Sequence, residues 1–297
     1  MNEVLNLYKN PGETPLECVL RFKKENPEYE NVPMTYAGRL DPLAEGVLLV
    51  LAGDAVHRKE EFLNLKKEYE VEVIFGVGTD TYDLLGLVKS EIRSTKSETN
   101  SNIKIQKNKQ ELTNSAIAEF VNSKNINNLL RENAENVLKN FIGKNVFEYP
   151  SYSSKPVNGK PLFSLARSGG LNGLEIPKKE VEIYNLEILN WRDINSKNLL
   201  KDIEEKIGKV NPVKSCSAGL SATKFNRASG DFRQGEIISK WKEVLDGIDG
   251  NFQIVKIKAE VSSGTYMRTL AHEWGKALGV PAIAFHILRT KVGEYKV

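Results

Sequence analysis

An aspartate stands between a polar loop and a short apolar run. Asp41 precedes Pro42, and a proline disfavours helical backbone angles at the residue before it, so we expect Asp41 to be extended. The run 47–51 is apolar and partly β-branched, which is typical of a strand buried on both faces. Gly38 and Gly46 allow turns and a close approach of the backbone. A carboxylate held there can act as a nucleophile, or it can form a turn or a salt bridge.

An arginine lies in the first turn of a helix that is expected after residue 264. One face of that helix carries the apolar residues Met267, Leu270, Ala271, Trp274 and Leu278. Arg268 lies off this apolar stripe, so it is free to reach away from the core. Because a positive charge is unfavourable at a helix N-terminus, Arg268 is expected to have an anionic partner.

A tyrosine begins a strand over 69–75, in which apolar side chains alternate with Glu70 and Glu72. Tyr69 therefore points to the apolar side of the strand. From the residues alone, it is a core tyrosine at a strand end with its hydroxyl in water.

Two loop segments contain groups that suit RNA. Residues 79–86 carry Thr and Asp side chains, which can bond their own backbone or face an RNA. The segment 149–169 interleaves rings with cations, namely Tyr149, Tyr152 and Phe163 with Lys155, Lys160 and Arg167. Bases stack on rings and phosphates pair with cations, so this segment is either a nucleic-acid contact or an irregular surface loop.

Regular elements must position these groups. A helix is expected to begin after Thr14, because Pro15 suits its first position and Glu17 can close a capping box. Further helices are expected at 58–67, 129–141 and 236–245, and further strands at 4–8, 181–189 and 255–261.

Two regions, 91–128 and 191–250, are interpreted as surface insertions. Residues 94–128 are mostly polar and bury too little apolar surface to offset their ordering entropy, so disorder is expected in their first half. One short helix is expected at 113–121. The region 191–250 has weak periodicity, and no function is assigned to it.

Composition restricts the function only loosely. The 297 residues, 27% charged and 40% hydrophobic, suit a soluble protein with one large or two small domains, and the net charge of +3 supports no global electrostatic argument. Cys18 and Cys216 fit no metal-ligand spacing, and the three histidines form no ligand set. No apolar run could span a bilayer and no secretion signal begins the chain, so the cytoplasm is expected.

Six stretches, in the same order along the chain, resemble motifs of the TruB family of tRNA pseudouridine synthases. Residues 38–48 are similar to its catalytic Leu-Asp-Pro segment. The other stretches are 9–14 (Lys-Pro-x-Gly-x-Thr), 67–69 with 79–86 (Lys-x-Tyr and Thr-Asp-Thr), 149–159 with 166–169 (Pro-Pro-x-Tyr-Ser-Ala-x-Lys-x-x-Gly), 264–270 (Gly-Thr-Tyr-Ile-Arg) and 288–293 (Leu-Arg-Arg-Thr-x-Val-Gly). The chain departs from the family at Tyr36, which takes the place of a histidine. At Arg39 it matches the Arg-Leu-Asp triplet of ribosomal-RNA pseudouridine synthases.

The resemblance implies a fold and a reaction. The fold is α+β, with a mostly antiparallel mixed sheet flanked by helices and loops. It forms a single catalytic domain over 1–297, without a C-terminal PUA domain. The implied reaction converts a uridine in the T-arm of tRNA to pseudouridine. The implied protein is a monomer that needs no metal or other cofactor and contacts no membrane.

The resemblance also assigns roles to residues. Asp41 is the implied nucleophile, Arg268 keeps that carboxylate ionised and oriented, and Tyr69 stacks on the detached base. The substrate-binding residues carried over in the same way are Tyr36, Tyr266, Leu288, Asp80, Lys155 and Arg167. Two alternatives stay open. The same chemistry could act on another RNA, as Arg39 suggests, or the fold could serve as a non-catalytic RNA-binding module, against which the presence of both Asp41 and Arg268 argues.

Overall fold

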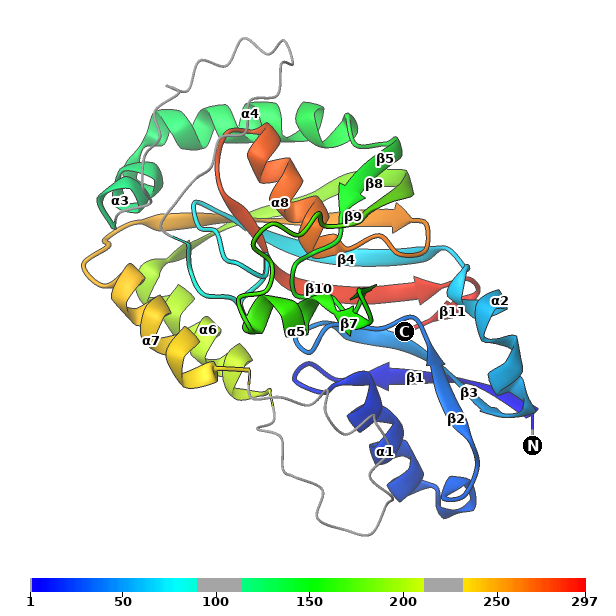
Figure 1. Ribbon diagram of the computed structural model, residues 1–297. Helices are drawn as coiled ribbons and strands as arrows, with labels where there is room; N and C mark the ends of the chain where they lie inside the picture. The colour runs from blue at the N-terminus through cyan, green and yellow to red at the C-terminus, as the bar shows by residue number, and fades with distance from the viewer. Residues whose placement is uncertain (1, 90–113, 211–231) are drawn as a thin grey trace.

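The computed structural model describes residues 2–89, 114–210 and 232–297, and its described part contains one mixed sheet of nine strands. Those strands are β1 (Asn2–Lys9), β2 (Met34–Ala37), β3 (Glu45–Gly53), β4 (Lys67–Phe75), β5 (Gly143–Glu148), β8 (Lys178–Asn195), β9 (Asn251–Val261), β10 (Ala282–Val292) and β11 (Tyr295–Lys296). The main path runs β1-β3-β10-β4-β9-β8-β5, with β2 beside β3 and β11 beside β10 (Figure 1). Only the β3–β10 pair is parallel among these described strands. The predicted α+β class with a mostly antiparallel mixed sheet is confirmed.

The α-helices of the described ranges lie between these strands. They are α1 (Pro15–Glu25), α2 (Lys59–Leu63), α3 (Asn114–Asn122), α4 (Lys124–Lys139), α5 (Leu162–Arg167), α6 (Ser196–Gly208), α7 (Gln234–Leu245) and α8 (Met267–Ala277). Short 3₁₀ helices span Pro27–Tyr29 and Asp54–Arg58, and a small hairpin pairs β6 (Pro156–Val157) with β7 (Lys160–Pro161). No helix in the described ranges is long and apolar enough to cross a bilayer.

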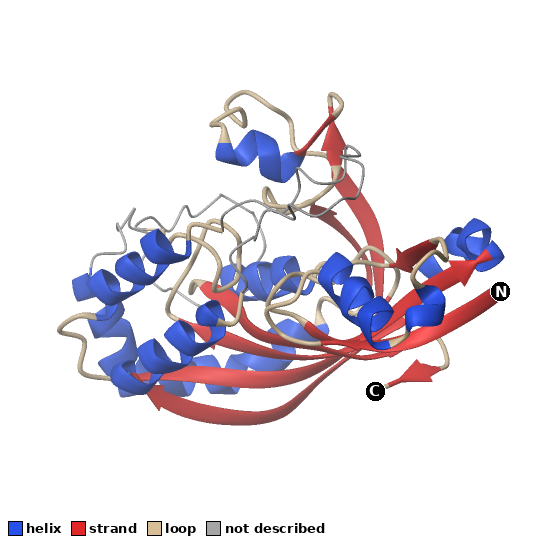
Figure 2. Ribbon diagram, turned by 90° about the horizontal axis from the view of Figure 1, so that it is seen from below, coloured by secondary structure: helices blue, strands red, loops and turns tan. Residues whose placement is uncertain are grey.

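The two faces of the sheet differ in chemistry. On β4, the apolar positions face a core in which Phe75 contacts Trp274 of α8, with ring centroids 5.1 Å apart. Trp274 in turn donates to the Ala134 carbonyl of α4 at 3.1 Å, so α4 and α8 cover the same face. The alternate positions Glu68 and Glu70 pair with lysines of β9 on the other face. Figure 2 shows most helices and loops on one side of the strands.

Strand β3 and helix α1 form where their sequence signals predict them. Residues 47–52 of β3 are no more than 1% exposed, as expected for a run without polar side chains. Gly46 has a φ of +107°, and a Cβ there would overlap the Arg289 carbonyl of β10. Glycine therefore permits the close parallel pairing of β3 with β10. At α1, both hydrogen bonds of the Thr14–Glu17 capping box are present.

The interpretation of 191–250 as a surface insertion is wrong for the residues that the structure describes there. Strand β8 runs to Asn195, and α6 and α7 bury apolar side chains in the main core: Leu199, Ile203, Ile207, Ile237 and Trp241. The spacing of 199, 203 and 207 is that of one helical face, a signal that the weak overall periodicity obscured.

The predicted helix at 113–121 is confirmed as α3, but α3 also packs into the main core through Ile117, Phe120 and Val121, so it is no surface appendage either. The helix predicted at 129–141 begins earlier, at Lys124. The predicted disorder over the first half of 94–128 falls on residues that lie outside the described ranges.

Candidate active site

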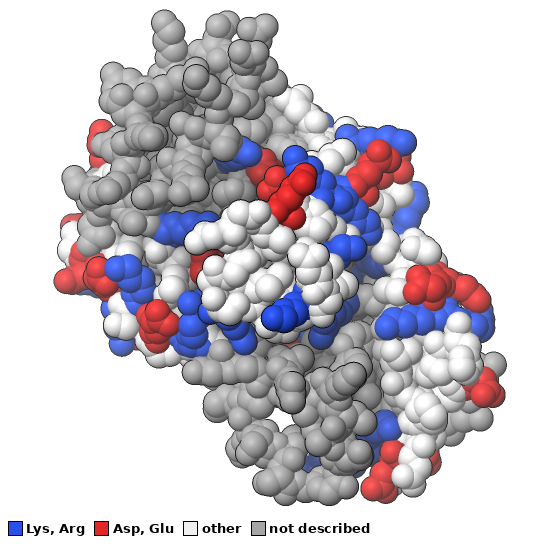
Figure 3. Space-filling view, viewed as in Figure 1, with Lys and Arg blue, Asp and Glu red and all other residues white. Residues whose placement is uncertain are grey.

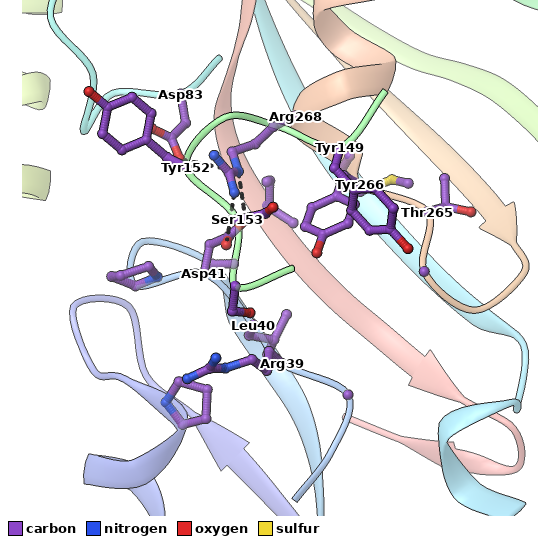
Figure 4. A pocket seen from close by; sticks show the side chains of 18 of the residues that line it. Arg39, Leu40, Asp41, Asp83, Tyr149, Tyr152, Ser153, Thr265, Tyr266 and Arg268 are labelled. Carbon is purple, nitrogen blue, oxygen red and sulfur yellow. Dashed lines mark hydrogen bonds and ion pairs between the residues drawn. The ribbon is translucent and has the colours of Figure 1, made fainter. Parts of the chain in front are cut away.

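A cavity of about 530 Å³ opens beside β3, β4 and β10. Its lining comes from separate parts of the chain, which include residues 14–15, the 38–44 loop, residues 60–69, the 81–85 loop, the 149–167 segment, Lys179, residues 232–233 and residues 263–289. Figure 4 shows that side chains from these parts, far apart in sequence, converge on one space. The sequence motifs thus meet at a single site.

Asp41 and Arg268 form a two-pronged ion pair in this cavity. The Arg268 Nε lies 2.8 Å from one carboxylate oxygen and Nη2 lies 3.1 Å from the other (Figure 4). Nη1 donates to the Thr81 carbonyl at 2.7 Å. The arginine side chain is 3% exposed and the aspartate side chain 34%, so the carboxylate faces the cavity while its partner is enclosed. The anionic partner expected for Arg268 is therefore Asp41, although Arg268 is buried rather than reaching away from the core.

The electrostatics of Arg268 are set by two carboxylates. Burial alone would lower the pKa of its guanidinium, but the charges of Asp41 and Asp83 outweigh burial and raise that pKa. Arg268 consequently stays charged at neutral pH. A permanently charged guanidinium in bidentate geometry fixes the direction in which Asp41 points.

Asp83 is a site residue that sequence reasoning missed. Its carboxylate lies 3.5 Å from Arg268 Nε and accepts from the Thr81 hydroxyl at 2.5 Å and from the Leu85 amide at 3.0 Å. Burial raises the pKa of Asp83 to about 6, and the charge of Asp41 adds to this effect while Arg268 opposes it. The sequence prediction chose Asp80 of the same loop, and only the conformation of the loop shows that Asp83 is the aspartate that points inward.

The backbone around Asp41 is held by two buried cations. Lys9 donates to the carbonyls of Pro42 at 3.1 Å and Ala44 at 2.5 Å. Arg289 donates to the Val47 carbonyl at 2.7 Å and to the carbonyls of residues 38 and 39 at 3.2 and 3.4 Å. Both cations are at most 1% exposed, and burial lowers the pKa of Lys9 to about 8. The loop that carries the carboxylate is thus rigidly seated on β1 and β10.

Aromatic rings form the walls beside the ion pair. Tyr69 is 7% exposed and lines the cavity from β4. Tyr266 precedes α8, and its ring meets that of Tyr149 edge to face with centroids 5.9 Å apart. Burial and the nearby charge of Asp41 raise the pKa of Tyr266 to about 12, so its hydroxyl remains protonated. The sequence-predicted positions of Tyr69 and Tyr266 at the cavity agree with the structure.

The predicted role of Leu288 does not fit the structure, because its neighbours Ile287 and Arg289 line the cavity instead. Side chains alternate across a strand, so Leu288 points to the other face of β10. The signal was present in the sequence. When the family's Leu-Arg-Arg-Thr-x-Val-Gly is aligned backward from Thr290, its leucine falls on Ile287 rather than on Leu288.

Three other predicted binding residues lie outside the cavity lining. Tyr36 packs against a small core cluster beside α1. Asp80 accepts from the Leu87 amide at 2.9 Å and lies 3.6 Å from Arg233, so it stabilises its loop. The Lys155 Nζ lies over the ring of Tyr149, 5.2 Å from its centroid.

Arg167 does line the cavity, and it reveals a wall that was not predicted. Its guanidinium carbon lies over the rings of Phe163 and Phe232, at 5.7 and 5.6 Å from their centroids. Arg233, which follows Phe232 in the sequence, also lines the cavity, and its Nη2 donates to the Tyr152 hydroxyl at 3.3 Å. Residues from the region without an assigned function therefore enclose part of the site.

The chemistry of this arrangement is that of a positioned carboxylate beside flat walls. Within the described ranges, no group of three His, Cys, Asp or Glu side chains is placed to hold a metal ion. A carboxylate fixed by a guanidinium can attack an electrophilic carbon, and the surrounding rings can stack on a planar group.

Comparison with known proteins gives a family match. The family model described as TruB family pseudouridylate synthase (N terminal domain) matches residues 29–116 and 98–208. One solved structure, a crystal structure of a Cbf5-Nop10-Gar1 complex, is 18% identical with a TM-score of 0.47, covering 99% of this chain and 49% of that one.

Curated relatives named tRNA pseudouridine synthase B match most of the chain. The protein of Oceanobacillus iheyensis is 27% identical over 295 residues, which are 99% of this chain and 67% of that protein. The protein of Deinococcus radiodurans is 26% identical over 264 residues, 88% of this chain and 65% of that protein. The protein of Clostridium tetani is 25% identical over 299 residues, 100% of this chain and 70% of that protein. The chain thus spans about two thirds of the length of these relatives.

Proposed function

The chain belongs to the TruB family of pseudouridylate synthases, and we propose on this basis that it converts a uridine of tRNA to pseudouridine. The observation that carries the proposal is the bidentate Asp41–Arg268 pair, which sits in a cavity walled by Tyr69 and Tyr266. Pseudouridine formation needs one carboxylate and one flat-walled pocket for a pyrimidine, and it needs no oxidant or energy source. The site supplies both requirements.

In the proposed reaction, the bond between ribose C1′ and N1 of the base breaks and a bond between C1′ and C5 forms. N1 gains a proton and C5 loses one, so the reaction is an isomerisation. The Asp41 carboxylate attacks either the sugar or the base and is released at the end. In this proposal, Arg268 keeps the carboxylate oriented throughout, and Tyr69 stacks on the detached base and takes the C5 proton.

The proposed RNA element is the T-arm, from which the target nucleotide must leave its stack. Unstacking a base costs a few kcal/mol, which contacts to the surrounding RNA must offset. Arg39, Arg167 and Lys179 line the cavity and provide cations for the neighbouring phosphates. On the face of the molecule seen in Figure 3, Lys and Arg side chains surround a mostly uncharged middle and are interspersed with Asp and Glu. We also propose that the protein acts as a monomer and that the reaction takes place in the cytoplasm.

A transcribed T-arm hairpin tests this function. The expected result is one pseudouridine per hairpin at the target uridine, and none when that uridine is replaced by cytidine. The absence of product from the uridine hairpin would contradict the proposal.

A second candidate function is the same reaction on another RNA. It is favoured by Arg39, which lines the cavity and completes the Arg-Leu-Asp triplet found in ribosomal-RNA pseudouridine synthases. Pseudouridines mapped in RNA from cells with and without the gene distinguish the two candidates. Sites lost from ribosomal RNA rather than from tRNA would favour the second.

A further inference from the structure

One polar group of the cavity has no partner in the protein. Ser153 is 3% exposed and lines the cavity, and its hydroxyl makes no hydrogen bond to any described residue. The other buried side chains of the described ranges that share this property do not line the cavity: Asn127, Trp241, Gln253 and Thr269. Buried polar groups are nearly always paired, because an unpaired one destabilises the fold. A partner for Ser153 is therefore expected from outside the chain.

The backbone around Ser153 fixes the position of that hydroxyl. The Ser153 carbonyl accepts from the Phe163 amide at 3.0 Å, and the Lys155 carbonyl accepts from the Leu162 amide at 2.9 Å. These bonds tie the segment to the start of α5. Figure 4 shows Ser153 next to the Asp41–Arg268 pair, where the reacting nucleotide must lie.

We propose that the Ser153 hydroxyl donates a hydrogen bond to a carbonyl oxygen of the target uracil, an inference that rests on the function proposed above. A uracil that enters the cavity loses water from two carbonyl oxygens, and each then needs a donor. The Arg268 donors closest to the site are engaged by the Asp41 carboxylate and the Thr81 carbonyl. The Ser153 hydroxyl, by contrast, is a buried donor at the cavity that no described residue engages.

The symmetry of the reaction lets one such donor act both before and after the base turns. When the detached base turns about the axis through N3 and C6, N1 and C5 change places. The carbonyl oxygens on C2 and C4 change places as well. A fixed hydroxyl therefore meets a carbonyl oxygen at the same point before and after the turn. The Ser153 hydroxyl can therefore hold the base during the stage in which the base has no covalent bond to the ribose.

The test combines a protein variant with altered substrates. Ser153→Ala, Ser153→Cys and the control Ser151→Ala are assayed on T-arm hairpins that carry uridine, 2-thiouridine or 4-thiouridine at the target position. Ser151 lies in the same segment but does not line the cavity. Loss of one hydrogen bond should lower kcat/KM of Ser153→Ala on uridine about tenfold. Ser153→Cys, with a weaker donor of similar shape, should fall between Ala and Ser.

The thio substrates identify the contact. Because sulfur is a poor acceptor, the thiouridine whose sulfur meets Ser153 in the slowest step should slow the wild-type enzyme, and on that substrate Ser153→Ala should show a smaller further loss than on uridine. Equal activity of wild type and Ser153→Ala on uridine would overturn the inference while leaving the proposed function intact. The inference would also be overturned if Ser153→Ala lost as much activity relative to wild type on both thiouridines as it does on uridine. No product from the wild-type protein would instead refute the proposed function. If Ser153→Ala does not fold, as judged by circular dichroism, Ser153→Cys carries the same comparison.

Discussion

Two walls of the cavity are built in different ways. The wall that carries Asp41 is held by the buried cations Lys9, Arg268 and Arg289, which bind its carboxylate or its backbone carbonyls. The second wall, 149–167 with 232–233, is held by contacts of arginines with rings, such as Arg167 over Phe232, and by partly exposed charges, such as the Arg233–Asp80 pair at 30% and 22% side-chain exposure. Buried charge pairs are costly to break, whereas exposed ones contribute little. The Asp41 carboxylate is therefore held more firmly than the second wall of the cavity.

The largest effect should come from the ion pair of the first wall. Arg268→Lys keeps the charge but cannot bind both oxygens of Asp41 and the Thr81 carbonyl together. We expect a loss of about 10³-fold in the single-turnover rate on a T-arm hairpin, the equivalent of breaking a buried charge pair. A near wild-type rate in a folded Arg268→Lys protein would show that the bidentate geometry is unimportant.

The next effect concerns the ring beside that pair. Tyr69→Phe keeps base stacking but removes the hydroxyl, and loss of a general base lowers rates by about 10²-fold or more. RNA affinity, measured by filter binding, should stay the same. An unchanged rate would restrict Tyr69 to packing.

Asp83 should make the first wall sensitive to pH. Its pKa is raised by burial to about 6 from an ordinary value of 3.8, so it takes up a proton in the folded protein as the pH falls through about 6. We expect the rate to fall there, because the neutral group no longer attracts Arg268. Asp83→Asn should lack this step and be about tenfold slower at neutral pH. A profile with the same step in both proteins would assign it to another group.

The raised pKa of Asp83 also determines how its contribution to folding stability changes with pH. Because the folded pKa lies above the unfolded one, the contribution of Asp83 to stability is complete below pH 3.8 and is lost as the pH rises through about 6.

The smallest effects compare the two walls directly. Arg289→Met removes donors from three backbone carbonyls of the first wall and should lower the free energy of unfolding by about 3 kcal/mol. Arg233→Ala in the second wall should lower it by about 0.5 kcal/mol. Urea titrations measure both. Equal losses would mean that the two walls are held equally firmly.

The first wall could largely be predicted from the sequence, because its signals are local or carried by short motifs. Asp41, Tyr69 and Arg268 each stand near a boundary of a regular element, and periodicity gave the direction of the Tyr69 side chain. At Arg268 periodicity predicted a side chain that reaches away from the core, whereas the structure buries it against Asp41. The error at Leu288 came from aligning the family motif one residue out of step, and in a strand that shift selects the opposite face.

The second wall could not be predicted, because it depends on tertiary contacts between irregular segments. Nothing in the spacing of Phe232 and Arg233 indicates that they reach Arg167 and Tyr152, which lie some distance away in the chain. Asp83 was missed for a related reason. Its loop contains two aspartates, and only burial distinguishes the one beside Arg268 from the one that caps a turn.

The most direct test of the account is Asp41→Asn, measured for product and for RNA binding on the same T-arm hairpin. Asparagine has nearly the same shape but is a poor nucleophile, so we predict no pseudouridine with RNA affinity largely intact. Full formation of pseudouridine by Asp41→Asn would contradict the central claim that this carboxylate does the chemistry.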